Sequence, residues 1–139
     1  MKQQKSKGRI LFIEDEIGIL NIYHDFLIEN GYEFLATKDI KEALVLTENK
    51  KPDLVMLDII IPKPNNTIAE QGWEYLEAVK KNQKTKNIPV IVFTNLDTLE
   101  DREKSEKMGA AGFIFKCDCS PDEVLSAISQ VIKESRLNK

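Results

Sequence analysis

The amino-acid sequence predicts a three-layer α/β sandwich, with a five-stranded parallel sheet covered by helices on both faces. Five short apolar segments alternate along the chain with five segments of helical spacing. The apolar segments are nearly continuous, as strands buried on both faces require, instead of alternating with polar residues. With 139 residues, 42% of them hydrophobic, the chain is long enough for one domain with one core.

In the first half of the chain, each expected strand is followed by a helix with an identifiable end. Residues 9–14 (RILFIE) form the first strand, and the helix expected over residues 16–29 is followed by a glycine suited to its C-terminus. Residues 33–37 form a second, weaker strand. Asp39 can cap the next helix, which ends before Pro52.

The second half of the chain repeats this pattern three times. Strands are expected at residues 53–58, 88–94 and 112–116, and helices at residues 72–81, 98–108 and 120–133. The last helix begins with Ser-Pro-Asp-Glu, which is the pattern of a capping box. We expect one folded domain over residues 9–136, with polar tails at residues 1–8 and 137–139.

Charge and composition exclude several classes of function. The 20 Lys and Arg residues against 23 Asp and Glu give a net charge of -3, without the broad positive field that holds nucleic acid. The apolar segments are too short to cross a membrane and the N-terminus lacks an apolar signal segment, so a cytoplasmic protein is expected. Cys117 and Cys119, with His24 as the single histidine, are too few for a zinc site, and both thiols are expected to be reduced.

Polar side chains stand where the apolar strands end. They are Glu14 and Asp15 after the first strand, Asp58 after the third, Thr94 after the fourth and Lys116 after the fifth. In a parallel sheet these ends lie at one edge, and for a strand order of 2-1-3-4-5 the ligand-binding crevice lies between the first and third strands. The three acids are therefore expected around one crevice.

Three neighbouring carboxylates repel one another, so a cation is expected among them. The available ligands are oxygens and few in number, which favours Mg²⁺ with several retained waters over a dedicated Ca²⁺ cage. Mg²⁺ beside a carboxylate suits phosphoryl transfer because it neutralises charge on the transferring oxygens.

From about residue 9 to residue 133, the sequence resembles the receiver domains of two-component response regulators. The resemblance is carried by Glu14-Asp15-Glu16, by LVMLDIIIP around Asp58, by PVIVFTN around Thr94 and by GAAGFIFK ending at Lys116. A lone acidic pair would be weak evidence, whereas this ordered set at successive strand ends is specific. The resemblance implies a flavodoxin-like fold and a phosphorelay signalling protein that is no separate enzyme but assists its own phosphorylation and dephosphorylation.

By this resemblance, Asp58 accepts a phosphoryl group from a phosphohistidine of a sensor histidine kinase or a phosphotransfer protein. Asp15 and Asp58 would ligate Mg²⁺ directly, Glu14 through a bound water and Ile60 through its backbone carbonyl. Lys116 would stabilise charge on the phosphoryl oxygens.

The same resemblance implies a conformational switch. The hydroxyl of Thr94 would donate a hydrogen bond to the arriving phosphoryl group, and Phe113 would turn inward into the space that Thr94 leaves. These movements would change the face made by the fourth helix, the fifth strand and the fifth helix, to which an unknown downstream protein would bind.

Three features of the chain depart from the usual pattern of these domains or refine it. The loop at residues 63–71 (KPNNTIAEQ) is longer by about six residues, and we expect it to overhang the phosphorylation site and shape the choice of kinase or partner. Cys117 stands where proline is usual after Lys116; because a cis bond before a non-proline residue costs roughly 2.5 to 4 kcal/mol, we expect a trans or strained peptide. Ile60 and Leu96 are expected to exclude attacking water and prolong the aspartyl phosphate.

Other classes of protein remain as alternatives. A flavodoxin-like module that binds a small ligand would need a phosphate loop rich in Ser, Thr and Gly, whereas Glu14-Asp15-Glu16 would repel a phosphate without a metal. An enzyme that releases phosphate through an aspartyl intermediate usually has a second acid where Ile60 stands. A degenerate receiver that binds partners without phosphorylation would not need the complete set of motifs.

Overall fold

The computed structural model describes residues 5–138, so residues 1–4 and 139 of the predicted tails lie outside it. Its strands are β1 (Arg9–Ile13), β2 (Glu33–Thr37), β3 (Leu54–Leu57), β4 (Val90–Thr94) and β5 (Gly112–Phe115). All neighbouring strands pair in parallel, in the order β2-β1-β3-β4-β5. The predicted strand order is therefore confirmed.

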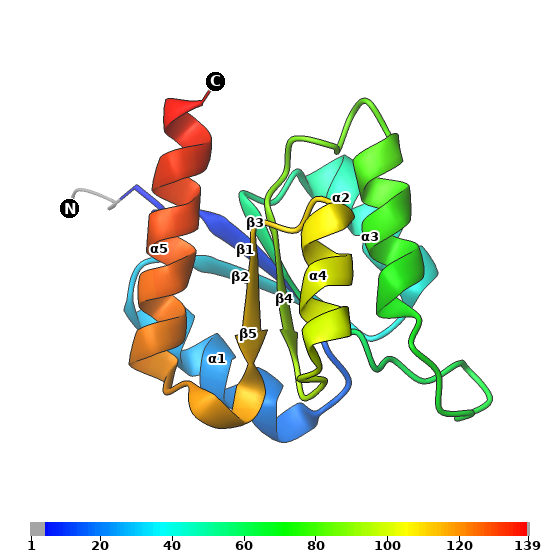
Figure 1. The fold of residues 1–139 in the computed structure, drawn as a ribbon. Helices are drawn as coiled ribbons and strands as arrows, with labels where there is room; N and C mark the ends of the chain where they lie inside the picture. Colours follow the sequence, from blue (N-terminus) through cyan, green and yellow to red (C-terminus); the bar gives the residue numbers. More distant parts are fainter. Residues whose placement is uncertain (1–4, 139) are drawn as a thin grey trace.

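The helices cover both faces of this sheet, which confirms the flavodoxin-like three-layer architecture (Figure 1). They are α1 (Ile17–Glu29), α2 (Ile40–Lys50), α3 (Gly72–Lys81), α4 (Leu99–Lys107) and α5 (Pro121–Leu137), with a 3₁₀ turn, η1 (Lys116–Asp118), after β5. In Figure 1, α1 and α5 lie on one side of the sheet, and α2, α3 and α4 lie on the other. Within the described part of the chain, every helix is too short or too polar to cross a membrane.

Each face of the sheet has its own hydrophobic core. On one face, the buried side chains of β1, β3 and β4 pack against Ala43 of α2 and against Trp73, Leu76 and Val79 of α3. On the other, alternate residues of the same strands pack against side chains of α1 and α5. This double burial explains why the strand sequences are continuously apolar.

The predicted side-chain caps hold the helix starts in place. Asp39 Oδ1 accepts a hydrogen bond from Glu42 N at 3.0 Å at the start of α2. Ser120 and Glu123 form the capping box at the start of α5. Because these caps satisfy backbone groups locally, the loops that precede them are held at defined positions beside the sheet.

The structure corrects several element boundaries. Lys7 N donates to Gly31 O at 2.9 Å and Gly8 O accepts from Glu33 N, so the end of the predicted N-terminal tail pairs with the chain beside β2. Strand β4 starts at Val90, two residues later than predicted, because Ile88 N is used in a turn with Thr85 O. Helix α5 runs four residues past its predicted end at residue 133.

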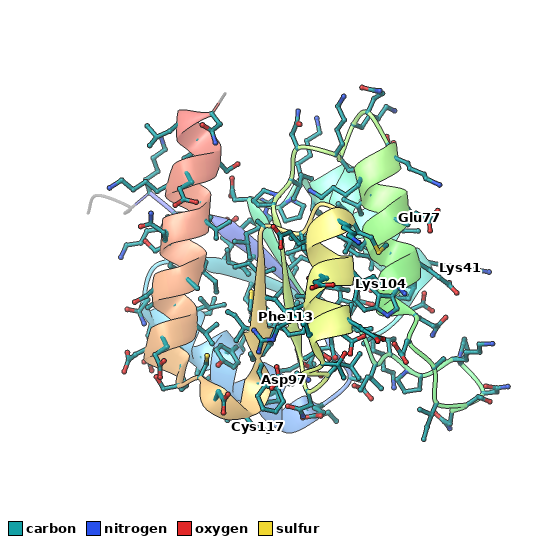
Figure 2. The ribbon with its side chains drawn as sticks, viewed as in Figure 1. Lys41, Glu77, Asp97, Lys104, Phe113 and Cys117 are labelled. Atoms are coloured by element: carbon teal, nitrogen blue, oxygen red, sulfur yellow. The ribbon has the colours of Figure 1, made fainter. Side chains whose placement is uncertain are left out.

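Helix α4 is held to its neighbours mainly by cationic side chains. Of its residues only Ser105 is buried. The ammonium group of Lys104 lies 4.4 Å from the centroid of the Trp73 ring in α3, and the Arg102 guanidinium lies 4.9 Å from that of Phe113 in β5. Figure 2 shows Lys104 and Phe113 on this side of the molecule. Because few of its side chains are buried, α4 can shift at a low cost in packing.

Candidate functional site

The register of the central strands brings two acids side by side. Ile13 pairs with Leu57 in the parallel ladder between β1 and β3. Glu14 and Asp58 follow these two residues directly, and Asp58 N donates to Ile13 O at 3.0 Å. Each acid stands at the carboxyl end of its strand, so both side chains enter the crevice between β1 and β3.

Asp15 joins these two acids in one cluster. One carboxylate oxygen from each of Glu14, Asp15 and Asp58 lies within 4.8 Å of the others, which is close enough for all three to contact one cation. Glu14 is 2% exposed and Asp58 is 5% exposed, while Asp15 is half-buried. Charges this close and this poorly hydrated require a counter-charge.

Lys116 supplies part of that counter-charge from the end of β5. Its Nζ donates to Asp58 Oδ2 at 2.8 Å and lies 2.7 Å from Glu14 Oε1, and its side chain is 5% exposed. Burial lowers the pKa of Lys116, but the hydrogen bond that it donates to Asp58 and the negative charges of Asp58 and Glu14 outweigh burial and raise this pKa above its usual range. Lys116 therefore stays an ammonium ion at neutral pH.

One oxygen of the cluster lacks a well-directed partner. Glu14 Oε1 is buried, and among the described residues no donor approaches it with the direction of a hydrogen bond, although Lys116 lies beside it. Burial raises the pKa of Glu14 to about 7. The negative charge of Asp58 also raises this pKa, whereas the ammonium group of Lys116 lowers it. Three carboxylates surround one ammonium group, and Glu14 Oε1 is a buried oxygen that accepts no well-directed hydrogen bond from the described residues. Such an oxygen-lined site fits a hard divalent cation.

A pocket of about 250 Å³ opens over the cluster. Its lining residues are Asp15, Glu16, Asp58, Ile60, Pro62, Ile68, Asn95 and Lys116. Asp58 and the side chain of Lys116 are buried at its base, whereas Glu16, Asn95 and Ile68 are exposed and form its outer part. Ile60 N also donates to Asp58 Oδ1 at 3.2 Å, so the backbone of Ile60 lies next to the carboxylate.

Neither of the two predicted switch residues lines this pocket. Thr94 is fully buried, and its Oγ1 accepts a long hydrogen bond of 3.4 Å from Leu96 N. Phe113 is half-buried, packs against the core and lies under the Arg102 guanidinium. Asp97, labelled in Figure 2, accepts a hydrogen bond from Arg102 Nε at 2.9 Å.

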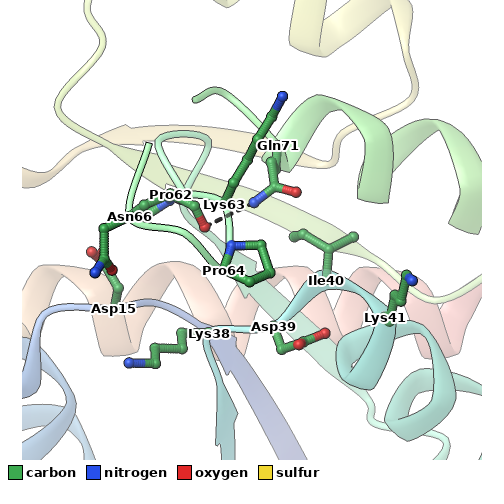
Figure 3. Close-up of a pocket in the computed structure, with 10 residues that line it drawn as sticks. All are labelled: Asp15, Lys38, Asp39, Ile40, Lys41, Pro62, Lys63, Pro64, Asn66 and Gln71. Carbon is green, nitrogen blue, oxygen red and sulfur yellow. Dashed lines mark hydrogen bonds between the residues drawn. The ribbon is translucent and has the colours of Figure 1, made fainter. Parts of the chain in front are cut away.

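A second and larger cavity, of about 640 Å³, lies beside the first (Figure 3). It separates the loop before α2 from the loop after β3, and its lining includes the three lysines Lys38, Lys41 and Lys63. Asp15 and Pro62 line both cavities. Pro62, the first residue of the loop at residues 62–71, therefore lies where the two cavities meet, beside the acid cluster.

Sequence reasoning missed several residues that shape the site. Asn95 and Ile68 line the pocket. Ile68 could have been noticed in the sequence, because it is the only large apolar residue in the polar loop 63–71. Gly72 starts α3 directly against the site, because a Cβ at this position would lie 2.5 Å from Asp58 O. A close approach of this kind depends on tertiary packing, which the sequence does not reveal.

The Lys116–Cys117 peptide bond beside the site is trans, which is one of the two predicted outcomes. Cys117 and Cys119 are both free thiols, and Cys117 Sγ lies 3.3 Å from Asn95 Oδ1. The replacement of proline by Cys117 thus leaves Lys116 in contact with Asp58.

Comparison with known proteins identifies relatives for nearly the whole chain. The sequence matches the response regulator receiver domain family over residues 10–129. It is 30% identical to the protein named "Probable transcriptional regulator ycf29" from Pyropia yezoensis, over 94% of this chain and 56% of that protein. It is also 30% identical to the phosphate regulon transcriptional regulatory protein PhoB of Escherichia coli, over 90% of this chain and 52% of PhoB. The chain therefore spans about half the length of these curated relatives.

Solved structures agree with this match. The fold resembles a CheY-like response regulator receiver domain from Methanospirillum hungatei, with a TM-score of 0.82 and 26% identity over 98% of this chain and all of the other. A signal receiver domain of a LuxO repressor protein from Vibrio parahaemolyticus, at 21% identity, has the same fold, with a TM-score of 0.82 over 94% of both chains.

Proposed function

The chain belongs to the response regulator receiver domain family, and we propose that it is a phosphorelay switch whose phosphoryl acceptor is Asp58. The donor would be a phosphohistidine on a sensor histidine kinase or on a phosphotransfer protein. The observation that carries this proposal is the contact of Asp58 with Lys116 inside the acid cluster, at the base of an open pocket.

The transfer follows from the position of the Asp58 carboxylate. One of its oxygens attacks phosphorus, the bond between phosphorus and the histidine nitrogen breaks, and that nitrogen keeps the electron pair. Lys116 already donates to Asp58 Oδ2, so a small displacement places its ammonium group against the new phosphoryl oxygens. Ile60 N, 3.2 Å from Asp58 Oδ1, helps to hold the carboxylate in place before transfer.

We propose that the acid cluster holds Mg²⁺. Asp15 and Asp58 would provide direct ligands, Glu14 would act through a bound water and Ile60 would offer its backbone carbonyl. When bound, the ion neutralises charge on the phosphoryl oxygens. This assignment is supported by the proximity of the three acids and by the buried Glu14 Oε1, which accepts no well-directed hydrogen bond from the described residues.

The proposed output is a change in the face formed by α4, β5 and α5. Thr94 is fully buried, and its Oγ1 accepts one long hydrogen bond from Leu96 N, so its hydroxyl hydrogen is available to a phosphoryl oxygen. Its displacement would allow Phe113 to turn farther inward and away from the Arg102 guanidinium. Helix α4, with little buried surface, would adjust, and a downstream protein would recognise the altered face.

Intact mass after incubation with acetyl phosphate and Mg²⁺ tests the assignment of Asp58. We expect the natural protein to gain the mass of one phosphoryl group and Asp58→Asn to gain none. Asp53→Asn is the matched control, because Asp53 stands at the other end of β3 and should leave phosphorylation intact. Addition of EDTA should prevent the gain in mass. A phosphorylated Asp58→Asn protein, or a natural protein that gains no mass, would overturn the proposal.

A further inference from the structure

The loop at residues 62–71 between β3 and α3 has a fixed position beside the phosphoacceptor pocket. Gln71 Nε2 donates to Ile61 O at 3.1 Å and to Pro62 O at 2.8 Å, and the second of these bonds is drawn in Figure 3. Ile61 also pairs with Glu70 in an isolated bridge, and Trp73 Nε1 donates to Glu70 Oε1 at 2.9 Å. These bonds join the two ends of the loop and set its base against the sheet.

The tip of this loop is folded by its own hydrogen bonds. Asn66 N donates to Lys63 O at 2.8 Å, and Lys63 N donates to Thr67 O at 3.0 Å. Asn66 has a φ of 66°, in the left-handed region that asparagine tolerates better than most residues. Asn65 Oδ1 accepts a further bond from Thr67 N at 3.0 Å. The turn ends at Thr67, and the next residue, Ile68, lines the pocket that contains Asp58.

Packing does not explain an isoleucine at this position. Ile68 is 86% exposed, so it contributes little to the hydrophobic core. The other residues of the outer pocket, Glu16 and Asn95, have polar side chains that can hold water by hydrogen bonds. Among these exposed lining residues, Ile68 has an apolar side chain, which cannot hold water by hydrogen bonds.

The direction from which water attacks an aspartyl phosphate makes the position of Ile68 important. When an aspartyl phosphate is hydrolysed, a water oxygen attacks phosphorus on the side opposite the Asp58 oxygen. The bond between phosphorus and that oxygen then breaks, the carboxylate leaves with the electron pair, and a proton of the water passes to solvent. Because Asp58 is buried at the base of the pocket, the attacking water must come from the outer part, where Ile68 stands.

We infer that Ile68 prolongs the phosphorylated state by keeping attacking water away from the phosphoryl group, held in place by the folded loop 62–71. This inference rests on the proposed phosphorylation of Asp58. Ile68 acts as a positioning residue, because it organises the approach of water and takes no part in bond making. The role differs from recognition of a donor protein, which would require Ile68 only while the donor is bound.

The decay of the phosphorylated protein tests this inference with a small donor. The natural protein, Ile68→Ala, Ile68→Leu and Thr67→Ala are phosphorylated with acetyl phosphate and Mg²⁺, the donor is removed by desalting, and the phosphorylated fraction is followed by intact mass. We expect Ile68→Ala to lose its phosphoryl group on the order of threefold to tenfold faster than the natural protein, because water gains access. Ile68→Leu should restore slow decay, and Thr67→Ala, altered in the same loop but outside the pocket, should decay at the natural rate.

The outcomes separate this inference from the proposal on which it rests. Equal decay of the natural protein and Ile68→Ala would overturn the role of Ile68 while leaving Asp58 as the acceptor. Faster decay of Thr67→Ala to the same extent would also overturn it, since a change outside the pocket would then act as strongly as the loss of the Ile68 side chain. A natural protein that never gains mass would overturn both. Because Ile68 is exposed, the unfolding midpoints of all four proteins should agree, which shows that any difference in decay arises in the pocket.

Discussion

The two ends of the parallel sheet carry charged side chains in contrasting arrangements. At the amino end, Asp53 Oδ2 accepts from Arg9 N at 2.7 Å, and Arg9 Nε donates to Glu33 Oε2 at 3.0 Å. The side chains of Arg9 and Glu33 are also partly hydrated, at 37% and 53% exposed. At the carboxyl end, Glu14 and Asp58 are buried and share one ammonium group, that of Lys116.

This difference separates a structural end of the sheet from a functional one. Hydrated and paired charges at the amino end lose little on folding and need no further ligand. Buried like charges at the carboxyl end lower stability unless something else binds them. A protein keeps such an arrangement where binding or chemistry requires it. Substitutions at the two ends of the sheet should therefore change the free energy of unfolding in opposite directions or by unequal amounts.

The largest contrast is expected between two glycines. A Cβ at Gly72 would lie 2.5 Å from both Asp58 O and Ile59 Cα, which are backbone atoms that cannot yield easily. A Cβ at Gly8 would meet atoms no closer than 3.4 Å, among them Ile132 Cδ1. We expect Gly72→Ala to lower the free energy of unfolding by about 3 kcal/mol, and Gly8→Ala to change it by less than about 1 kcal/mol in either direction.

Urea denaturation measures both changes. Equal losses in the two glycine variants would contradict the contrast, because they would mean that the backbone beside Asp58 can move away. A second measurement sharpens the test. Any folded fraction of Gly72→Ala should be phosphorylated more slowly by acetyl phosphate than the natural protein, since the displaced backbone carries Asp58.

A smaller contrast is expected when one acid at each end is made neutral. The pKa of Glu14 is raised from 4.5 to about 7 by burial, so the folded protein retains a proton that the unfolded chain releases between these pH values. Its ionisation therefore lowers stability progressively as pH rises from about 4.5 to 7. Without divalent ions, we expect Glu14→Gln to raise the free energy of unfolding at pH 8 by on the order of 2 kcal/mol.

Urea denaturation at several pH values with EDTA present checks this effect. The advantage of Glu14→Gln should be small at pH 5 and reach its full size above pH 7. Glu33→Gln is the control at the amino end, and its exposed ion pair with Arg9 should be worth less than about 1 kcal/mol. Addition of Mg²⁺ should reduce the advantage of Glu14→Gln, because a carboxylate binds the ion better than an amide. An advantage that does not depend on pH would argue against burial of the charge as its cause.

The fold and the convergence of the acids could be predicted because they depend on local pattern. Continuous apolar segments predicted strands buried on both faces, and an acid at the end of a buried strand must lie at the sheet edge. Pairing of Ile13 with Leu57 then places Glu14 beside Asp58, as expected for the first and third strands. The phosphoryl-transfer roles of these residues stay predictions.

Other features could not be predicted because they depend on contacts that are distant along the chain or lack a periodic pattern. The loop at residues 63–71 has no apolar period, and its fold is set by the bonds of Gln71 to Ile61 and Pro62. Its expected overhang agrees with the position of Ile68 in the pocket, but a role in kinase choice is untested. The pairing of Lys7 with Gly31 was missed because polar terminal residues give no signal of backbone hydrogen bonding.

The smallest contrast is expected between two buried threonines. At the amino end, Thr85 Oγ1 donates to Val79 O at 2.8 Å and the side chain is 3% exposed. At the carboxyl end, Thr94 Oγ1 accepts one long hydrogen bond of 3.4 Å from Leu96 N. Valine has the same branched shape without the hydroxyl, so each substitution removes only hydrogen bonding. We expect Thr85→Val to lower the free energy of unfolding by about 1 kcal/mol and Thr94→Val by less than half of that.

Urea denaturation of both valine variants, together with their phosphorylation by acetyl phosphate, distinguishes structure from function at these positions. A larger loss of stability in Thr94→Val than in Thr85→Val would mean that the Thr94 hydroxyl is already committed to the folded state, and therefore is not free to meet a phosphoryl group. If Thr94→Val is stable and still gains a phosphoryl group, its hydroxyl is needed for neither folding nor transfer. The remaining role for this buried hydroxyl at the carboxyl end of β4 is then to detect the phosphoryl group after it has arrived.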